Sequence, residues 1–165
     1  MPAFDVVPAA ELDRAALLAL NNAYATELSP LDAAALDRLL ATAAHATGVA
    51  PADALLIAFD QDADYASVNF RWWQARRPNF LYVDRLVVAP HARGKGLARA
   101  LYADLFAAHP GRVVVCEVNS DPPNPASDAF HAVHGFGYAG EATLHGRGKS
   151  VRYLERVLPP GRPYA

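Results

Sequence analysis

The sequence has little of what marks several other classes of protein. A single cysteine, Cys116, excludes a disulfide framework and a four-cysteine zinc site. Charged residues make up only 19% of the chain and sum to a net charge of -2, whereas nucleic-acid-binding domains usually carry a basic face. No run approaches 18 apolar residues, so no segment is predicted to span a membrane. We therefore expect a globular protein without nucleic acid or membrane as a partner.

The composition that is present favours one folded domain. Hydrophobic residues make up 53% of the 165 residues, which excludes disorder as the main state. A chain of this length usually forms one domain, so we expect a single domain over residues 1–165. The first five residues lack the basic and apolar parts of a secretory signal, which predicts a cytoplasmic protein.

Hydrophobic periodicity predicts strands and helices in alternation. The long predicted helices end at turn residues, among them Gly48 and Pro51, and Gly146 and Gly148 separate the last two strands. The pattern predicts an α/β protein with a mixed, mostly antiparallel sheet of about seven strands. The expected strands are residues 4–7, 54–59, 66–72, 80–88, 112–118, 136–144 and 151–158, and the expected helices are residues 11–28, 32–46, 94–108 and 126–134.

A glycine-rich turn is the most informative segment. Gly94 and Gly96 lie between a predicted strand and a predicted helix, where free N–H groups and the helix dipole favour a phosphate. Lys95 and Arg99 add positive charge. The spacing fits neither the Walker loop nor the Rossmann fingerprint, and leaves the pattern Arg-x-x-Gly-x-Ala beginning at Arg93. The alternative is a glycine turn that binds no ligand.

Several motifs in residues 80–141 resemble one family in order and spacing. Residues 82–88 resemble its fourth strand, and residues 117–119, 124–127 and 130–136 resemble its fifth strand and the helix that follows, ending in Gly-Phe. On these motifs the chain is similar to the GNAT superfamily of N-acetyltransferases, and the glycine turn resembles their acetyl-coenzyme A pyrophosphate loop. The words Leu-Asn-Asn and Leu-Ser-Pro-Leu-Asp near the N-terminus further resemble a poorly characterised bacterial subgroup of predicted acetyltransferases.

The resemblance implies a fold and a cosubstrate. The implied fold has helices on both faces of the sheet and splayed fourth and fifth strands, with the pantetheine arm of acetyl-coenzyme A between them. We expect no metal. The residues that the resemblance assigns to the cosubstrate are Leu86, Val87, Val88, Arg93, Gly94, Lys95, Gly96, Leu97, Ala98, Arg99, Asn124, Ser127 and His131.

Two acidic residues are candidates for the base that deprotonates an amine. Glu117 is the first, because it occupies the acidic position of the fifth strand seen in ribosomal-protein N-terminal acetyltransferases. Its alternative role is a structural salt bridge. Asp84 on the fourth strand is the second candidate, and its alternative is a pair with Arg85 or Arg71, since buried charges are usually paired.

The residue at the position of the expected acid differs from the family pattern. Many members have a tyrosine four residues before Gly-Phe, where this chain has His131, which either protonates the thiolate or lines the cofactor path. Tyr138 is a second candidate for the acid. His131 and His134 lack a third metal ligand at suitable spacing. Cys116 alternates to the face opposite Glu117, which favours a buried structural residue over a nucleophile.

The sequence says least about the amine that would accept the acetyl group. Asn21, Asn22, Ser29 and Asp32 cluster where acceptor specificity often lies in this superfamily, although Ser29 or Asp32 also suits helix capping. Residues 72–73, a tryptophan pair, would line an acceptor pocket or a dimer interface.

The expected function is transfer of acetyl from acetyl-coenzyme A to a primary amine of a small molecule or peptide, by direct attack in a ternary complex. The alternatives are a non-catalytic module that binds or senses acyl-coenzyme A, and transfer of another acyl group. A homodimer is compatible with each of these functions.

Overall fold

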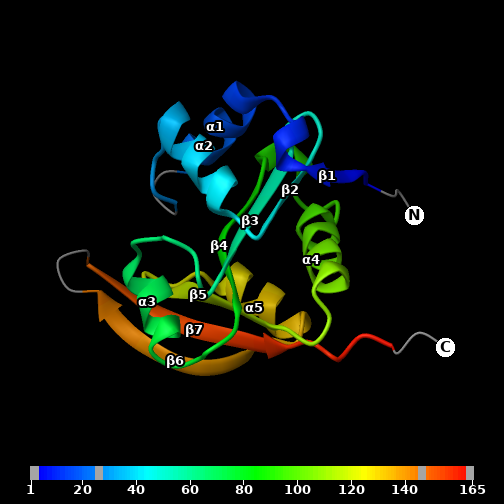
Figure 1. The fold of residues 1–165 in the computed structure, drawn as a ribbon. Coiled ribbons are helices and arrows are strands. Elements are labelled where there is room, and N and C mark those ends of the chain that lie inside the picture. The colour runs from blue at the N-terminus through cyan, green and yellow to red at the C-terminus, as the bar shows by residue number, and fades with distance from the viewer. Residues whose placement is uncertain (1–3, 25–27, 145–147, 163–165) are drawn as a thin grey trace. The chain divides into compact units, whose positions relative to one another are not determined.

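The computed structural model describes residues 4–24, 28–144 and 148–162. Its strands are β1 (Val6–Pro8), β2 (His45–Val49), β3 (Ala54–Asp60), β4 (Leu81–Val88), β5 (Val113–Asp121), β6 (Gly137–Leu144) and β7 (Lys149–Val157) (Figure 1). Its α-helices are α1 (Arg14–Asn22), α2 (Ala33–Thr42), α3 (Val68–Gln74), α4 (Leu97–Ala108) and α5 (Pro125–Val133). Short 3-10 helices are η1 (Ala9–Glu11) and η2 (Pro90–Ala92).

The strands form a mixed sheet in the order β1-β2-β3-β4-β5-β7-β6. β4 and β5 run parallel and pair through Leu81 with Val114 and Tyr82 with Val115. The pairs β1–β2, β2–β3, β5–β7 and β6–β7 are antiparallel. This confirms the predicted fold class, and pairing confined to the start of β4 is consistent with the expected separation of the fourth and fifth strands.

Two compact units make up the chain, and β4 passes from one to the other. The first unit comprises Met1–Asp64 and Val83–His109, and the second comprises Tyr65–Tyr82 and Pro110–Ala165. The expectation of a single GNAT-like domain over residues 1–165 stays a prediction.

The core of the first unit is built around β3. Every residue from Ala54 to Phe59 is fully buried, which confirms the strand predicted from this uninterrupted apolar run. α4 contributes a buried stripe of Leu97, Leu101 and Leu105 at helical spacing. This rigid core supports the glycine turn, because the turn leads directly into α4.

The second predicted helix, residues 32–46, is too long. α2 ends at Thr42, and the next segment is β2, which pairs with β3. Gly48 explains why: a Cβ atom there would lie 2.6 Å from the carbonyl oxygen of Ala54 and 2.7 Å from Leu12 Cδ1. The glycine therefore allows close approach of two strands and does not end a helix.

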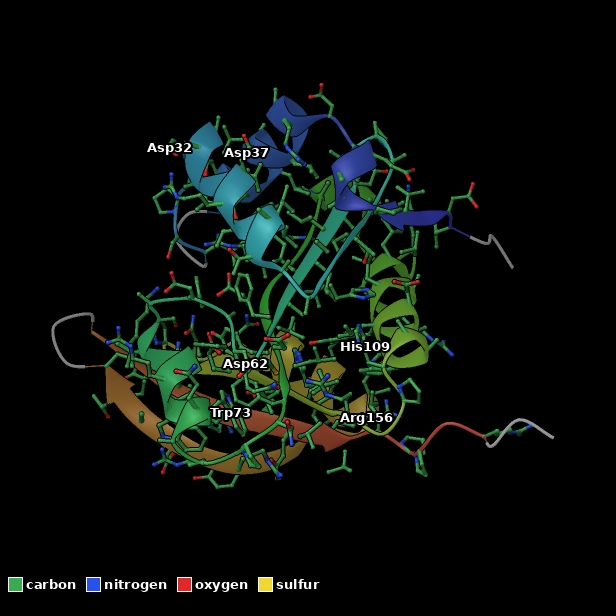
Figure 2. The ribbon with its side chains drawn as sticks, in the orientation of Figure 1. Asp32, Asp37, Asp62, Trp73, His109 and Arg156 are labelled. Carbon is green, nitrogen blue, oxygen red and sulfur yellow. The ribbon has the colours of Figure 1, made fainter. Side chains whose placement is uncertain are left out.

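The strand predicted at residues 66–72 is also wrong, because this segment forms α3. The Ser67 hydroxyl oxygen accepts a hydrogen bond from the Phe70 N–H at 3.3 Å and caps the helix. Phe70 and Trp73 are buried on one face at helical spacing, whereas Val68 is 60% exposed. The apparent alternation of apolar residues therefore did not reflect two faces of a strand. Trp73 is labelled on α3 in Figure 2.

Other differences concern boundaries. The first helix, predicted at residues 11–28, is α1, and residues 25–27 lie outside the described residues. The first strand, predicted at residues 4–7, is β1 and starts two residues later. Pro51 lies in the turn between β2 and β3. Gly146, predicted in the last turn, also lies outside the described residues. The remaining predicted strands and helices are confirmed with shifted ends.

The second unit is centred on β5 and β7. Their antiparallel register places Glu117 opposite Tyr153 and Val115 opposite Glu155. Residues two apart on a strand share a face, so Val115 and Glu117 point to the same side. Trp73 and Tyr153, almost fully buried, contact each other edge to face with ring centroids 5.9 Å apart. α3 is thereby packed against the strand that lies beside Glu117.

Candidate active site

The glycine turn of the first unit has a backbone that requires glycine. Gly94 and Gly96 have φ angles of 75° and 88°, in the left-handed region that glycine enters without steric cost. Gly96 is the N-cap of α4, so the helix begins at Leu97, three residues later than predicted. The two glycines therefore turn the chain sharply between η2 and the helix.

A row of backbone donors follows from this turn. Within the described residues, the N–H groups from Gly94 to Arg99 make no hydrogen bond, and Ala100 is the first whose N–H is bonded, to the Gly96 carbonyl at 3.0 Å. The first N–H groups of any helix lack intrahelical acceptors, and the helix dipole adds partial positive charge there. The turn can therefore bind an anion such as a diphosphate.

Exposed cations surround these donors. Arg93, Lys95 and Arg99 are all exposed. The Arg93 guanidinium lies 4.9 Å from the centre of the Tyr24 ring, and its Nε donates to the Val88 carbonyl at 3.4 Å. Arg93 is thus held beside the turn by an aromatic face and a backbone oxygen. Its charge adds to that of the backbone donors.

Asp53 is a site residue that the sequence did not indicate. Its carbonyl accepts the Ala89 N–H at 2.8 Å, and its carboxylate Oδ1 lies 2.8 Å from His91 Nε2. These two contacts tie the start of the glycine turn to the residues that precede β3. The Ala89 N–H is therefore already used within the protein. No motif marks Asp53, because its role depends on a contact across the sheet.

Asp84 is held in an ion pair. Its Oδ2 lies 3.0 Å from Arg85 Nε, and both side chains are buried. Arg85 in turn donates to Asn21 Oδ1 at 2.6 Å and to the Ser29 carbonyl at 2.9 Å. The geometry therefore favours the alternative role expected for Asp84, an ion pair with Arg85, over the role of catalytic base.

The polar cluster near α1 and α2 has structural partners. Asn22 exchanges two hydrogen bonds with the backbone of Leu31, each at 2.9 Å, and Asn21 Nδ2 donates to the Ser29 carbonyl at 3.1 Å. Asp32 caps α2 by accepting the Ala35 N–H at 2.7 Å (Figure 2). The capping role expected for at least one residue of this cluster is confirmed for Asp32.

Glu117 lies in the second unit at the centre of a polar network. Its Oε1 accepts hydrogen bonds from the Tyr82 hydroxyl at 2.8 Å and from Asn69 Nδ2 at 3.1 Å. Its Oε2 is shielded from solvent. Two donors to one oxygen favour the charged carboxylate over the acid. The arrangement therefore gives a partly buried carboxylate with a fixed orientation, as a general base requires.

α5 begins and ends with side chains that the resemblance assigned to the cosubstrate. Asn124 caps the helix, its Oδ1 accepting the Ser127 N–H at 3.2 Å. The buried His131 donates from Nδ1 to the Ser127 carbonyl at 2.7 Å. Burial lowers the pKa of His131, and the hydrogen bond to the Ser127 carbonyl, which raises it, offsets only part of this effect; His134 lowers the pKa slightly further and Asp128 raises it slightly. The ring is therefore neutral near pH 7, with its proton on Nδ1.

His131 gives a testable pH dependence of stability. Its pKa in the folded chain lies below the unfolded value of about 6.5, so the unfolded chain binds more protons between these two values. The free energy of unfolding should be constant above this window and fall as the pH drops through it. The fall should be about 1.4 kcal/mol for each pH unit of the shift.

Urea unfolding between pH 8 and pH 5 measures this effect, with His131→Gln as the test variant. The variant should lose stability less steeply with falling pH than the wild type. His134→Gln, at a half-buried neighbour that makes only a small contribution to the lowered pKa of His131, is the comparison variant and should change the pH dependence much less. An identical pH dependence in wild type and His131→Gln would contradict the assignment.

The remaining candidates have simple locations. Cys116 is buried and lies on the opposite face of β5 from Glu117. Tyr138 is 62% exposed on β6.

Across residues 4–24, 28–144 and 148–162, no group of three or more histidine, cysteine, aspartate or glutamate side chains is arranged to hold a metal. In the same ranges, no helix has the length and apolar character needed to cross a membrane.

The fold and the glycine turn agree with a family assignment. The model of the Acetyltransferase (GNAT) family matches residues 21–136, well over half of the chain. The chain belongs to this family of acetyltransferases. No curated protein matches the chain in sequence.

Solved structures of other proteins share the fold of this chain. The ribosomal-protein-alanine N-acetyltransferase from Brucella melitensis is 20% identical, with a TM-score of 0.67 over 93% of this chain and 99% of that one. The NatB acetyltransferase complex bound to CoA and MES is 11% identical, with a TM-score of 0.69 over 94% of this chain and 99% of that one. At these identities the similarity establishes the fold alone.

Proposed function

We propose that this protein is an N-acetyltransferase that moves acetyl from acetyl-coenzyme A to a primary amine of a small molecule or peptide, by direct attack in a ternary complex. The observation that carries the proposal is the row of backbone N–H groups from Gly94 to Arg99 that no described acceptor uses, flanked by exposed cations. Family membership supports acetyl transfer, and the amine as acceptor is our proposal.

The residues of the first unit fit the diphosphate of coenzyme A. In the proposed mode, the N–H groups of residues 94–99 bind the diphosphate oxygens at the start of α4. Arg93, Lys95 and Arg99 neutralise its charge. Leu86, Val87 and Val88 offer strand backbone along which the pantetheine arm pairs, as a peptide adds to a sheet edge.

The residues of α5 have a smaller role in this proposal. Asn124 Oδ1 is occupied by the Ser127 N–H, so its amide nitrogen is the group it can offer to the cosubstrate arm. Neutral His131 presents a lone pair rather than a proton at Nε2 when Nδ1 donates to a carbonyl. We therefore place His131 as a cofactor contact and not as the acid.

Glu117 supplies the proton transfer in the proposed mechanism. Acetyl-coenzyme A, when bound, supplies a thioester carbonyl that a neutral amine attacks, with a thiol as leaving group. A protonated amine cannot attack, so Glu117 accepts the proton that the amine must lose. The two hydrogen bonds to its Oε1 keep it in the charged form that accepts a proton.

The test is a panel of primary amines incubated with acetyl-coenzyme A and followed by release of free thiol. Turnover with at least one amine, together with calorimetric binding of coenzyme A, is the expected result. Binding without turnover by any amine would favour the non-catalytic acyl-coenzyme A module. Turnover only with longer acyl donors would favour transfer of another acyl group. An absence of binding would overturn the proposal.

A further inference from the structure

The second unit contains a hydrogen-bond network that extends well beyond Glu117. Glu117 Oε1 accepts from Tyr82 at 2.8 Å and from Asn69 at 3.1 Å. The hydroxyl of Tyr153 donates to Asn69 Oδ1 at 2.8 Å. These residues come from β5, β4, α3 and β7, so the network joins four elements of the unit. Nothing in the sequence pattern assigns a role to Asn69, Tyr82 or Tyr153.

The direction of each hydrogen bond is fixed by chemistry. A carboxylate only accepts, so Tyr82 and Asn69 must donate to Glu117. The amide oxygen of Asn69 also only accepts, so Tyr153 must donate to it, and this bond orients the amide with its NH2 group toward Glu117. Burial, followed by the nearby Glu117 carboxylate, raises the pKa of Tyr153 to about 12. Tyr153 therefore keeps its proton at every pH at which the protein would work.

Tyr153 is itself held rigidly by aromatic packing. Trp72 stacks on its ring, with centroids 3.8 Å apart and an interplanar angle of 15°. The Arg76 guanidinium lies 3.8 Å from the centre of the Trp72 ring. Trp72 also packs so closely on Gly140 that a Cβ atom there would lie 2.6 Å from the indole. The donor to Asn69 is thus fixed by a stack that only glycine at position 140 permits.

We propose that Asn69, Tyr82 and Tyr153 are positioning residues that hold Glu117 charged and in a single orientation for proton transfer. The proposal rests on the proposed role of Glu117 as the base. Tyr82 and Asn69 act directly on its Oε1, and Tyr153 acts through Asn69. Among the described residues, the ionisable groups near Glu117 include the phenols of Tyr82 and Tyr153. The charge of Arg76 lowers the pKa of Tyr153 slightly, against the larger effects that raise it.

The pH profile distinguishes positioning from a purely structural role. Tyr82→Phe and Asn69→Ala each remove one donor to the carboxylate, so the acidic limb of kcat/KM should move up by about one pH unit. Turnover at neutral pH should fall roughly tenfold, with the KM for acetyl-coenzyme A unchanged. Tyr153→Phe should shift the limb in the same direction by less. Glu141→Gln, at an exposed carboxylate on β6, is the control and should leave the profile unchanged.

A double-variant cycle tests whether these residues act through Glu117. In a Glu117→Gln background, adding Tyr82→Phe or Asn69→Ala should cause no further loss, because residues in one network are not additive. Independent losses that multiply in the double variants would overturn the proposal. Tyr82→Phe keeps the aromatic contact of this ring with Phe70, so it preserves packing even if Asn69→Ala does not.

A measurement without turnover separates this proposal from the proposed function. Carbon-13 NMR of side-chain-labelled glutamate follows the Glu117 carboxylate, identified by its loss in Glu117→Gln, through a pH titration. Tyr82→Phe and Asn69→Ala should both move its midpoint to higher pH. Unmoved midpoints would overturn the positioning role even if Glu117 is essential. Full activity of Glu117→Gln would instead overturn Glu117 as the base, and the catalytic role of the network with it.

Discussion

Replacement of Glu117 by glutamine is expected to lower kcat by about 10² to 10⁴-fold, the contribution typical of a general base. Glutamine has nearly the same shape, so packing against β7 is preserved. It cannot accept a proton from the amine, because its amide is not basic at neutral pH. Affinity for coenzyme A should remain unchanged, because the substitution alters none of the residues proposed to bind the diphosphate, residues 94–99 and the cations beside them. Steady-state kinetics and calorimetry measure the two effects separately.

The matched control for this experiment is Glu141→Gln, which makes the same chemical change at an exposed position of the same unit. It should retain wild-type kinetics. Glu117→Gln with wild-type turnover would remove Glu117 from the mechanism. Loss of turnover accompanied by a lowered melting temperature would instead point to a structural role for Glu117, of which a salt bridge is the form expected from the sequence.

Charge reversal at Arg93 should have the second large effect, and on binding rather than on turnover. Arg93→Glu is expected to weaken coenzyme A binding by on the order of 10²-fold, since it removes a charge-assisted contact and adds repulsion to a diphosphate. The wild-type side chain is exposed and held by Tyr24 and the Val88 carbonyl. Calorimetric titration at one fixed ionic strength measures the change, because salt screens such charges.

Arg38→Glu is the control for Arg93→Glu. Arg38 is an exposed arginine on α2 in the same unit, so the change in net charge is identical. Its affinity for coenzyme A should stay close to that of the wild type. Equal weakening by both variants would show a general effect of net charge. Unchanged affinity in Arg93→Glu would refute the assignment of the glycine turn as the diphosphate site.

The parts of the fold that were predicted correctly are those whose signal is local. The apolar run at residues 54–59 predicted β3 because a strand buried on both faces needs no alternation. The glycine turn was located because Gly94 and Gly96 have the left-handed backbone that few other residues adopt. In both cases the chemistry of a few consecutive residues was sufficient.

The errors occurred where tertiary contacts overrode local preference. Alanine-rich sequence around residue 46 favours helix, yet this segment is β2, because pairing with β3 contributes more than propensity. Alternation at residues 66–72 suggested a strand, although Ser67 caps a helix and Trp73 supplies its buried face. The predicted total of about seven strands was correct partly because these two errors offset each other.

The candidate site shows the same division. Glu117 was identified from the acidic position of the fifth strand, through the resemblance of its motif. Asn69 was not identified, because the segment that contains it was assigned to a strand. Tyr153 was missed for another reason: it reaches Asn69 only because β7 lies next to β5 in the sheet. Asn69 and Tyr153 are 84 residues apart in the chain, so no local sequence pattern predicts their contact.

The sequence alone therefore determined the family, the glycine turn with its cations, and the acidic residue at the centre of the second unit. Each follows from residue types at short spacing, where backbone geometry and charge act locally. Only the tertiary structure decided the partners of these groups: Asp84 with Arg85, Asp53 with the start of the turn, and Glu117 with Tyr82 and Asn69. The physical reason is that hydrogen bonds between distant segments depend on strand order and register. Many different sequences are compatible with the same strand order and register, so no short motif predicts these bonds.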